Sequence, residues 1–315
     1  MSNTERIPLL AVVGPTASGK TALAVELARR FDGEVLSFDS MQLYKGMDVA
    51  TAKPTEEEMR GIPHHLISAV DPADTYSVAR FQEDAARIIG EIRTRGKRPV
   101  LVGGTGQYLD ALVDNLQVLD TGDATEVRAR LREELATRGS AAMYERLSGI
   151  DPEYAETIHP NNTGRVLRAL EVYELTGYTM SYQIAQSRRE PGIYDVCYIG
   201  LDARDRDVLY DRINTRVDFM LENGLLDEAR VWLDDAPGTT AAQAIGIKEM
   251  LPFLQGEATL EDCAERLKTD TRHYAKRQLT WFRRNPAVHW LYIDENTPDE
   301  LVRKAVAITE EEGIF

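Results

Sequence analysis

One stretch of eight residues has the composition and spacing of a phosphate-binding loop. Gly14-Pro15-Thr16-Ala17-Ser18-Gly19-Lys20-Thr21 matches the pattern G-x-x-x-x-G-K-[ST]. Glycines let backbone N–H groups curl around an anion, and the lysine adds a mobile positive charge. The Thr21 hydroxyl is a candidate ligand for Mg²⁺ on the bound phosphates. Nucleotides, sugar phosphates and allylic diphosphates present similar oxygens, so the stretch predicts phosphate binding without identifying the ligand.

A second candidate for chemistry is Asp39, which follows an apolar run at residues 33–38. Ligands of open α/β sheets bind beyond the carboxyl ends of the strands, so we expect Asp39 near the phosphate-binding loop. There it could serve as a Mg²⁺ ligand, as a general base, or as both. The alternative is a loop aspartate that caps a turn.

These residues require a scaffold, and the sequence around them predicts one. The apolar run at 9–13 predicts a buried strand, and residues 21–30 predict a helix. Further strands are predicted at 33–40, 98–102, 196–201 and 290–293. Strand, glycine loop and helix in this order indicate an α/β fold, with a P-loop NTPase-like parallel sheet core and flanking helices.

The strand predicted at 98–102 runs into Gly103-Gly104-Thr105-Gly106. Many phosphate-loop enzymes carry an aspartate here that helps to hold Mg²⁺. Its replacement by a glycine turn favours relatives of small-molecule kinases over molecular motors. The glycines either let another molecule approach the backbone closely or form a tight turn between strand and helix.

From 117 to 192 the pattern changes to charged helical sequence with few strand signals. We therefore expect a smaller all-helical insertion domain at 117–192, within an α/β catalytic core formed by 1–116 and 193–315. Arg165 and Arg168 share a helix face in the insertion because they are three residues apart. A solvated charged face is the usual explanation for such a run.

The end of a helix predicted from Thr259 to Arg284 concentrates positive charge and aromatic rings. Residues 271–285 contain no acid. They include Arg272, His273, Lys276, Arg277, Arg283 and Arg284, interleaved with Tyr274, Trp281 and Phe282. On a chain with a net charge of -15, such a patch is typical of an RNA-binding surface. The alternative is a helix whose cations suit its dipole.

The bulk composition sets further limits. The chain has 315 residues, 43% of them hydrophobic, which is enough for a buried core. No apolar run reaches the length of a membrane span, and the N-terminal residues lack a secretory signal, so we expect a cytoplasmic protein with no membrane partner. Cys197 and Cys263 are expected to be buried, reduced and not metal-binding. Lys45 and Lys53 could face an anionic substrate or water.

Several separated segments together resemble one family, the tRNA dimethylallyltransferases or tRNA isopentenyltransferases, in its bacterial form. The phosphate-binding stretch alone is unspecific, whereas the combination is highly specific and spans most of the chain in the family's order. Besides that stretch, the matching segments are 39–48, 51–54, 63–66, 103–106 with Tyr108, 159–161, 165–172, 243–246 and 275–283.

The resemblance implies a reaction. The family transfers a dimethylallyl group from dimethylallyl diphosphate to N6 of adenosine 37, beside the tRNA anticodon, and releases diphosphate with the help of Mg²⁺. By this resemblance Gly14 to Thr21 hold the diphosphate, with Arg216 assisting. Asp39 matches the family's base, and Thr105 matches a residue that bonds the reacting adenosine. We expect the enzyme to act as a monomer on the anticodon stem-loop.

The resemblance also places a set of residues on the tRNA side. They are Asp39, Ser40, Met41, Gln42 and Thr105; Arg128, Gly164, Arg165, Val166, Leu167 and Arg168 in the insertion; Gln243, Gly246 and Lys248; and Lys276, Arg277, Gln278, Thr280, Trp281 and Arg283. Thr21 is the expected Mg²⁺ ligand, with Asp39 as a second candidate.

Three positions depart from the family pattern: Ala50 replaces a glycine, Gln107 a leucine and Ile247 a tyrosine. Two other activities use similar loops. Prenylation of free adenylate is disfavoured by the basic helix and the insertion, and a small-molecule kinase is favoured only by Gly14 to Thr21.

Overall fold

The computed structural model describes residues 6–116, 124–187, 192–234 and 240–315. The chain divides into two units, one that joins Met1–Val113 to Ile193–Phe315 and one that comprises Asp114–Gly192. The insertion boundary that we expected at residue 117 lies outside the described residues. The larger unit contains every strand of the described chain, and the smaller unit is helical.

The larger unit is built on a sheet whose described strands are all parallel, in the order β3-β2-β4-β1-β5-β6. This arrangement confirms the predicted α/β class. The strands are β1 (Ile7–Val13), β2 (Gly33–Ser37), β3 (His64–His65), β4 (Arg98–Val102), β5 (Tyr194–Asp202) and β6 (Val288–Tyr292).

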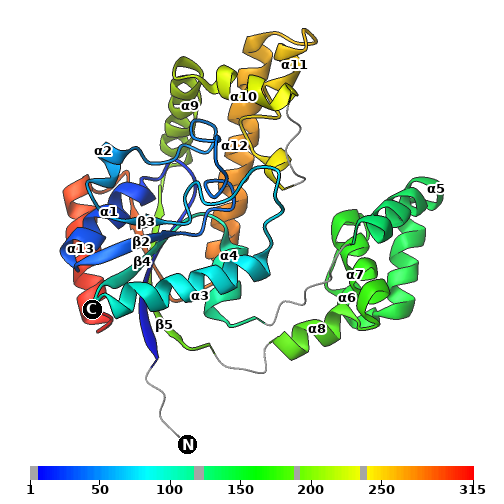
Figure 1. Cartoon of the computed structure of the whole chain (residues 1–315), viewed down its shortest axis with the longest axis horizontal. Coiled ribbons are helices and arrows are strands. Elements are labelled where there is room, and N and C mark those ends of the chain that lie inside the picture. The colour runs from blue at the N-terminus through cyan, green and yellow to red at the C-terminus, as the bar shows by residue number, and fades with distance from the viewer. Residues whose placement is uncertain (1–5, 117–123, 188–191, 235–239) are drawn as a thin grey trace, which may run out of the picture. The chain divides into compact units, whose positions relative to one another are not determined.

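Helices cover both faces of this sheet (Figure 1). The helices of the larger unit are α1 (Lys20–Arg30), α2 (Glu56–Met59), α3 (Val78–Thr94), α4 (Gly106–Val113), α9 (Arg206–Glu222), α10 (Leu225–Asp234), the 3₁₀ helix η1 (Ala241–Gln243), α11 (Leu251–Leu254), α12 (Leu260–Phe282) and α13 (Pro298–Glu311). Strand β1 divides the core because its side chains alternate between faces. Leu10 and Val12 pack with α1 and α13, whereas Leu9 and Ala11 join the cluster that contains α3 and α4.

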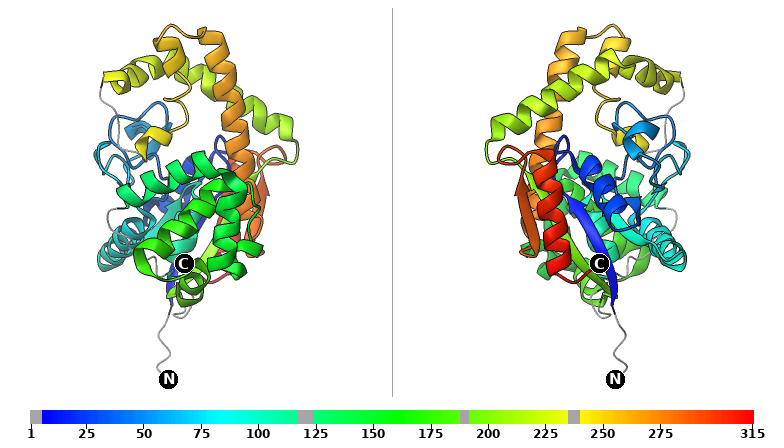
Figure 2. Two further views of the ribbon diagram at one scale, coloured as in Figure 1. Left: turned by 90° about the vertical axis from the view of Figure 1, so that its right-hand side faces the viewer. Right: turned by 90° about the vertical axis from the view of Figure 1, so that its left-hand side faces the viewer.

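Two long helices, α9 and α12, extend beyond the carboxyl ends of the strands (Figures 1 and 2). Helix α12 begins where we expected, because the Thr259 side chain caps it by accepting the N–H of Asp262. The loops that follow β1, β2 and β4 open at the same edge of the sheet. That edge is where parallel α/β sheets place their ligands.

The smaller unit consists of α5 (Thr125–Ile150), α6 (Pro152–Glu156), α7 (Thr163–Thr176) and α8 (Met180–Ser187). Gly139 interrupts α5 with φ 78, between the helical sequence patterns at 124–138 and 141–147. The unit has its own apolar core, which includes Leu131, Met143, Leu147 and Leu170. No helix among the described residues is sufficiently long and apolar to cross a membrane.

Candidate active site

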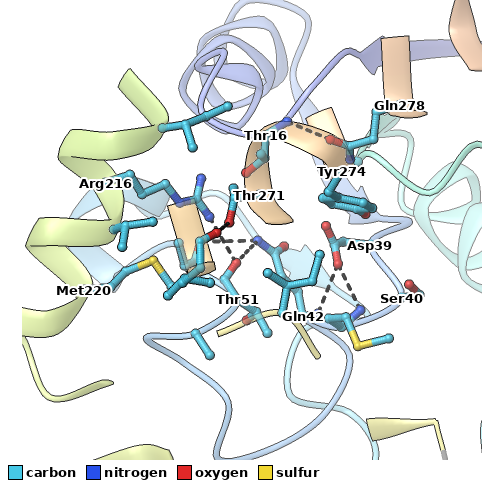
Figure 3. Close-up of a pocket in the computed structure, with 18 of the residues that line it drawn as sticks. Thr16, Asp39, Ser40, Gln42, Thr51, Arg216, Met220, Thr271, Tyr274 and Gln278 are labelled. Atoms are coloured by element: carbon cyan, nitrogen blue, oxygen red, sulfur yellow. Dashed lines mark hydrogen bonds between the residues drawn. The ribbon is translucent and has the colours of Figure 1, made fainter. Parts of the chain in front are cut away.

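A cavity of about 350 Å³ lies between the loops at the sheet edge and the two helices α9 and α12 (Figure 3). Among the described residues, its walls carry the cations Lys20, Arg216, Lys248 and Arg277 and a single acid, Asp39. The cavity is therefore locally positive on a chain whose net charge is -15. This charge favours an anionic ligand.

The phosphate-binding loop connects β1 to α1, as predicted. Its first glycine is needed for close packing, because a Cβ on Gly14 would lie 2.4 Å from the carbonyl oxygen of Leu201 in β5. The Pro15 carbonyl accepts hydrogen bonds from the Ser18 hydroxyl and the Lys20 ammonium. The loop conformation is thus fixed within the protein before any ligand binds.

Two cations that face the cavity are only partly compensated. Burial lowers the pKa of Lys20 to about 7; the positive charge of Arg216 acts in the same direction, and Asp39 opposes it. Burial also lowers the pKa of Arg216, again opposed by Asp39. The nearby carboxylates leave the pKa values of both cations lowered, so a bound anion would stabilise both charged forms. Arg212, one turn before Arg216, donates Nε to the Ala17 carbonyl at 2.8 Å and buttresses the loop.

Asp39 lies beyond β2, which ends at Ser37 and is shorter than we expected. The strand stops because one carboxylate oxygen of Asp39, Oδ1, accepts the N–H groups of Met41 at 2.9 Å and Gln42 at 3.3 Å. Asp39 therefore caps a turn and lines the cavity at once. Its other oxygen points toward the Tyr274 ring (Figure 3). Burial, together with the Asp39 charge, raises the pKa of Tyr274.

Thr105 stands next to the cavity but is not among the residues that line it. Its Oγ1 accepts the N–H of Ser40 at 3.1 Å and lies 3.2 Å from the Ser40 hydroxyl. The Tyr274 hydroxyl also interacts with Thr105. Asp39, Ser40, Thr105 and Tyr274 thus form one polar group at the side of the cavity.

Gln278, predicted to contact tRNA, is buried, with only 4% of its surface exposed. Its Oε1 accepts the N–H of Thr16 at 2.8 Å, and its Nε2 donates to the Gly104 carbonyl at 3.2 Å. The side chain therefore connects α12 to the phosphate-binding loop and to the turn after β4. It also removes the Thr16 N–H from the donors available to a ligand.

The glycine turn at 103–106 is explained by the same helix. A Cβ on Gly106 would lie 2.1 Å from Cδ1 of Trp281, another predicted tRNA contact. The Trp281 indole donates Nε1 to Asp110 at 2.9 Å. The segment that approaches this turn closely is therefore α12 of the protein itself and not another molecule, so internal packing at a tight strand-to-helix turn explains the glycines.

A loop opposite the phosphate-binding loop is held by Glu228 of α10, a residue that no motif singles out. The Glu228 carboxylate accepts three successive backbone N–H groups, at residues 48–50, at 2.7, 2.7 and 2.9 Å. The carbonyl of the following Thr51 accepts from Arg216 at 3.4 Å and from the Gln42 amide at 3.3 Å. Glu228 thus positions a wall of the cavity without lining it.

Lys53 faces neither the cavity nor water. Its ammonium bonds to the Tyr44 carbonyl, to Asp48 and to Ser68, and only 5% of its side chain is exposed. Lys45, by contrast, is exposed.

The sequence of residues 243–249 has a helical pattern, and the glycine within it predicts a close contact. The helix is absent, whereas the close contact is present. Gly246 has φ 113 and lies in a turn, with its Cα close to Ala50. A left-handed backbone conformation interrupts a helix. The neighbouring Ile247 is buried in the core, so the isoleucine that departs from the family pattern serves packing.

The structure divides the other predicted tRNA contacts into groups. Ser40, Met41, Gln42, Gln243, Lys248 and Arg277 line the cavity. Lys276, Thr280 and Arg283 surround a separate hollow beside α9, where Arg283 donates to Asp202 at 2.6 Å.

The contacts predicted in the smaller unit lie on α5 and α7. Arg128 donates to the buried Glu171 at 2.9 and 3.0 Å, and Arg168 bonds to the same carboxylate. Val166 is buried and Leu167 packs against the unit's core, whereas Gly164 and Arg165 are exposed. Val166 and Leu167 therefore stabilise the packing of α5 and α7 from within the core of the unit.

The donor set of the cavity suits a phosphate-bound magnesium ion. No cluster of three or more His, Cys, Asp and Glu side chains occurs in the part of the chain that the structure describes. Mg²⁺ commonly takes only one or two protein ligands and completes its shell with phosphate oxygens and water. Thr21 and Asp39 both line the cavity and fit this role.

Comparison with known proteins gives one consistent result. Residues 42–285 match the family described as IPP transferase, and residues 7–70 match isopentenyl transferase. The tRNA dimethylallyltransferase of Acetivibrio thermocellus is 48% identical over 298 residues, covering 94% of this chain and 95% of that protein. The tRNA dimethylallyltransferase of Halalkalibacterium halodurans is 50% identical over 283 residues, 90% of each chain.

Solved structures agree. The tRNA isopentenylpyrophosphate transferase of Bacillus halodurans aligns with a TM-score of 0.71 at 45% identity, over 97% of this chain and 98% of that one. A eukaryotic dimethylallyltransferase acting on tRNA aligns with a TM-score of 0.80 at 32% identity, over 97% of this chain and 79% of the other.

Proposed function

The chain belongs to the tRNA dimethylallyltransferase (IPP transferase) family and transfers a dimethylallyl group to tRNA, and we propose that dimethylallyl diphosphate is the donor and N6 of adenosine 37 the acceptor. One observation supports this proposal most directly. The phosphate-binding loop, Arg216 and Asp39 share the walls of one cavity.

In this proposal the diphosphate of the donor lies against Gly14 to Thr21. The helix α1 N-terminus, Lys20 and Arg216 then oppose the negative charge that grows on the diphosphate as the C1–O bond breaks. The electron pair of that bond leaves with the diphosphate. Stabilising the leaving group is the main contribution of this end of the cavity to the rate.

The adenine amine is a poor nucleophile because its lone pair is delocalised into the ring. Asp39 accepts the N6 proton as the N6–C1 bond forms, through the oxygen that does not cap the turn. Thr105 and Tyr274 flank Asp39 and orient the adenosine edge. The base reaches them only after leaving the anticodon stack, so the enzyme turns it out of the RNA.

The tRNA backbone approaches from the side of α12 that exposes Lys276 and Arg277. Thr21 would hold Mg²⁺ on the diphosphate, where the ion would supply positive charge to the leaving group. We further propose that the enzyme acts as a monomer in the cytoplasm, where its tRNA substrate is found.

One assay tests the proposal against the two related activities. The enzyme is offered dimethylallyl diphosphate with unmodified tRNA or with AMP, and in parallel ATP with candidate acceptors. Nucleosides from the digested tRNA are identified by mass spectrometry. We expect N6-dimethylallyl adenosine at position 37 and no product from AMP or ATP. Transfer to AMP alone, or to another nucleotide of the tRNA, would refute the proposal.

A further inference from the structure

The cavity has an apolar wall that the chemistry described above does not use. On α9, Ile213, Val217 and Met220 lie on the same helix face as Arg216, because they are spaced by three and four residues. Leu267 of α12 completes this wall. Arg216, the cation proposed to bind the diphosphate, is thus flanked on α9 by apolar side chains.

Two polar contacts fix how α9 and α12 face each other. Lys268 bonds to Asp218 at 2.9 Å, and Arg272 donates to Asn214 at 2.7 Å. The residue numbers of these contacts decrease along α9 as they increase along α12, so the two helices are antiparallel. This register brings Met220 of α9 level with Leu267 of α12.

In this register Met220 and Leu267, which both line the cavity, lie toward the ends of the two helix walls that are remote from Gln278 and the phosphate-binding loop. Gln278 holds the opposite part of α12 against that loop through Thr16. Leu267 is eleven residues before Gln278, which corresponds to about 16 Å along a helix at ~1.5 Å per residue. Both end residues are buried, with 6% of Met220 and 1% of Leu267 exposed.

We propose that Met220 and Leu267 set the length of the prenyl chain that this enzyme accepts, limiting it to five carbons. The inference rests on the proposed function, since it assumes a prenyl diphosphate in the cavity. The reacting bonds are the same for a longer donor: C1–O breaks, N6–C1 forms, the proton goes to Asp39 and the diphosphate leaves. The prenyl tail takes no part in these bond changes, so only the size of the apolar wall distinguishes a five-carbon donor from a longer one.

The packing explains why the limit is sharp. Geranyl diphosphate carries five more carbons than the dimethylallyl donor, and a close-packed wall between two registered helices does not yield to that volume. A methylene too many or too few in an apolar pocket changes specificity by roughly 10- to 200-fold. Shortening either side chain opens space for the second isoprene unit.

The test compares dimethylallyl and geranyl diphosphate in Met220→Ala and Leu267→Ala, with unmodified tRNA as acceptor. We expect the ratio of kcat/KM for geranyl over dimethylallyl diphosphate to rise by at least about 10-fold. Met250→Ala is the matched control, because Met250 is also buried but does not line the cavity. Its ratio should equal that of the wild type.

A folded Met220→Ala or Leu267→Ala variant with an unchanged ratio would overturn the proposal. If thermal melts show that the alanine variants do not fold, Leu267→Val gives the same readout with a smaller change in volume. Dissociation constants of the two diphosphates, measured without tRNA, test chain-length selection separately. This binding measurement tests the chain-length proposal even if the wild type modifies no tRNA. The absence of tRNA modification would refute only the proposed function.

Discussion

Asp39 uses its two carboxylate oxygens differently, and this allows its proposed chemical role to be separated from its structural one. In Asp39→Asn the amide oxygen can still accept the N–H groups of Met41 and Gln42, but the side chain no longer accepts a proton. We expect turnover to fall by about 10²- to 10⁴-fold while pyrophosphate affinity stays within about twofold. Single-turnover kinetics and calorimetry measure the two quantities.

Equal turnover in Asp39→Asn and the wild type would exclude Asp39 as the base. Loss of pyrophosphate affinity along with turnover would instead point to a role for Asp39 in holding the metal.

Lys20 gives the donor site a predictable pH dependence. Because the pKa of Lys20 is lowered to about 7, the free enzyme loses this proton as the pH rises above 7. A bound diphosphate raises that pKa again, so binding between pH 7.5 and about 9 should take up a proton at Lys20. Pyrophosphate titrations in buffers of different ionisation enthalpy measure the uptake.

The diphosphate has its own protonation equilibria, so Lys20→Met is titrated in parallel. The uptake by the wild type minus that by the variant should approach one proton near pH 8.5 and vanish below about pH 5.5. A difference of zero throughout would mean that Lys20 is already charged in the free enzyme.

The site residues with local signals could be predicted from the sequence, and those that act at a distance could not. The phosphate-binding loop was recognisable because its chemistry is encoded in eight consecutive residues. Asp39 could be located because it follows a strand. Glu228 could not, because a glutamate on a polar helix carries no sign of the three N–H groups that it accepts.

At the scale of elements, the docking of α12 on the turn after β4 determines the shape of the site. Gly106→Ala places a Cβ against the Trp281 ring and should destabilise the larger unit by about 1–3 kcal/mol. Urea unfolding followed by tryptophan fluorescence reports on this unit, because Trp232, Trp281 and Trp290 all belong to it.

Gly90→Ala is the matched control for this substitution. Gly90 lies inside α3 with no heavy atom within 4 Å of an added Cβ, so alanine should be neutral or stabilise by up to about 1 kcal/mol. Similar unfolding midpoints for the two variants would show that α12 shifts to accommodate the methyl group.

Element types could be predicted from periodicity, but their mutual packing could not. The apolar run at 9–13 predicted a strand and residues 21–30 predicted a helix, and β1 and α1 are both present. The pattern at 243–249 indicated a close contact at its glycine, but it could reveal neither that the partner is Ala50 nor that the backbone turns there. Such contacts between distant segments are invisible to any short window of sequence.

At the scale of the whole molecule, an acidic chain must bind an acidic polymer, so the exposed cations of α12 should dominate the salt dependence of tRNA binding. In Lys276→Ala with Arg277→Ala, we expect weaker binding and a shallower slope of log K against log salt. The slope should change by about 0.7 for each tRNA phosphate that the variant no longer neutralises. Filter binding at a series of salt concentrations measures it.

The matched control changes another adjacent pair of cations, Arg303 and Lys304 on α13, to alanine. It removes the same net charge from a surface outside the cavity. We expect its slope to equal that of the wild type, and equal slopes in both double variants would mean that only net charge matters.

The bond between Thr16 and Gln278 joins residues 262 positions apart. During translation the first segment of the site therefore leaves the ribosome long before its last partner is made. β1 can pair with β5 only after the whole helical insertion has been synthesised, because β5 follows the insertion in the chain. A product truncated before Gln278 would retain the complete glycine-lysine stretch and still lack the side chain that secures it, so the nascent enzyme becomes competent to hold its donor only near the end of synthesis.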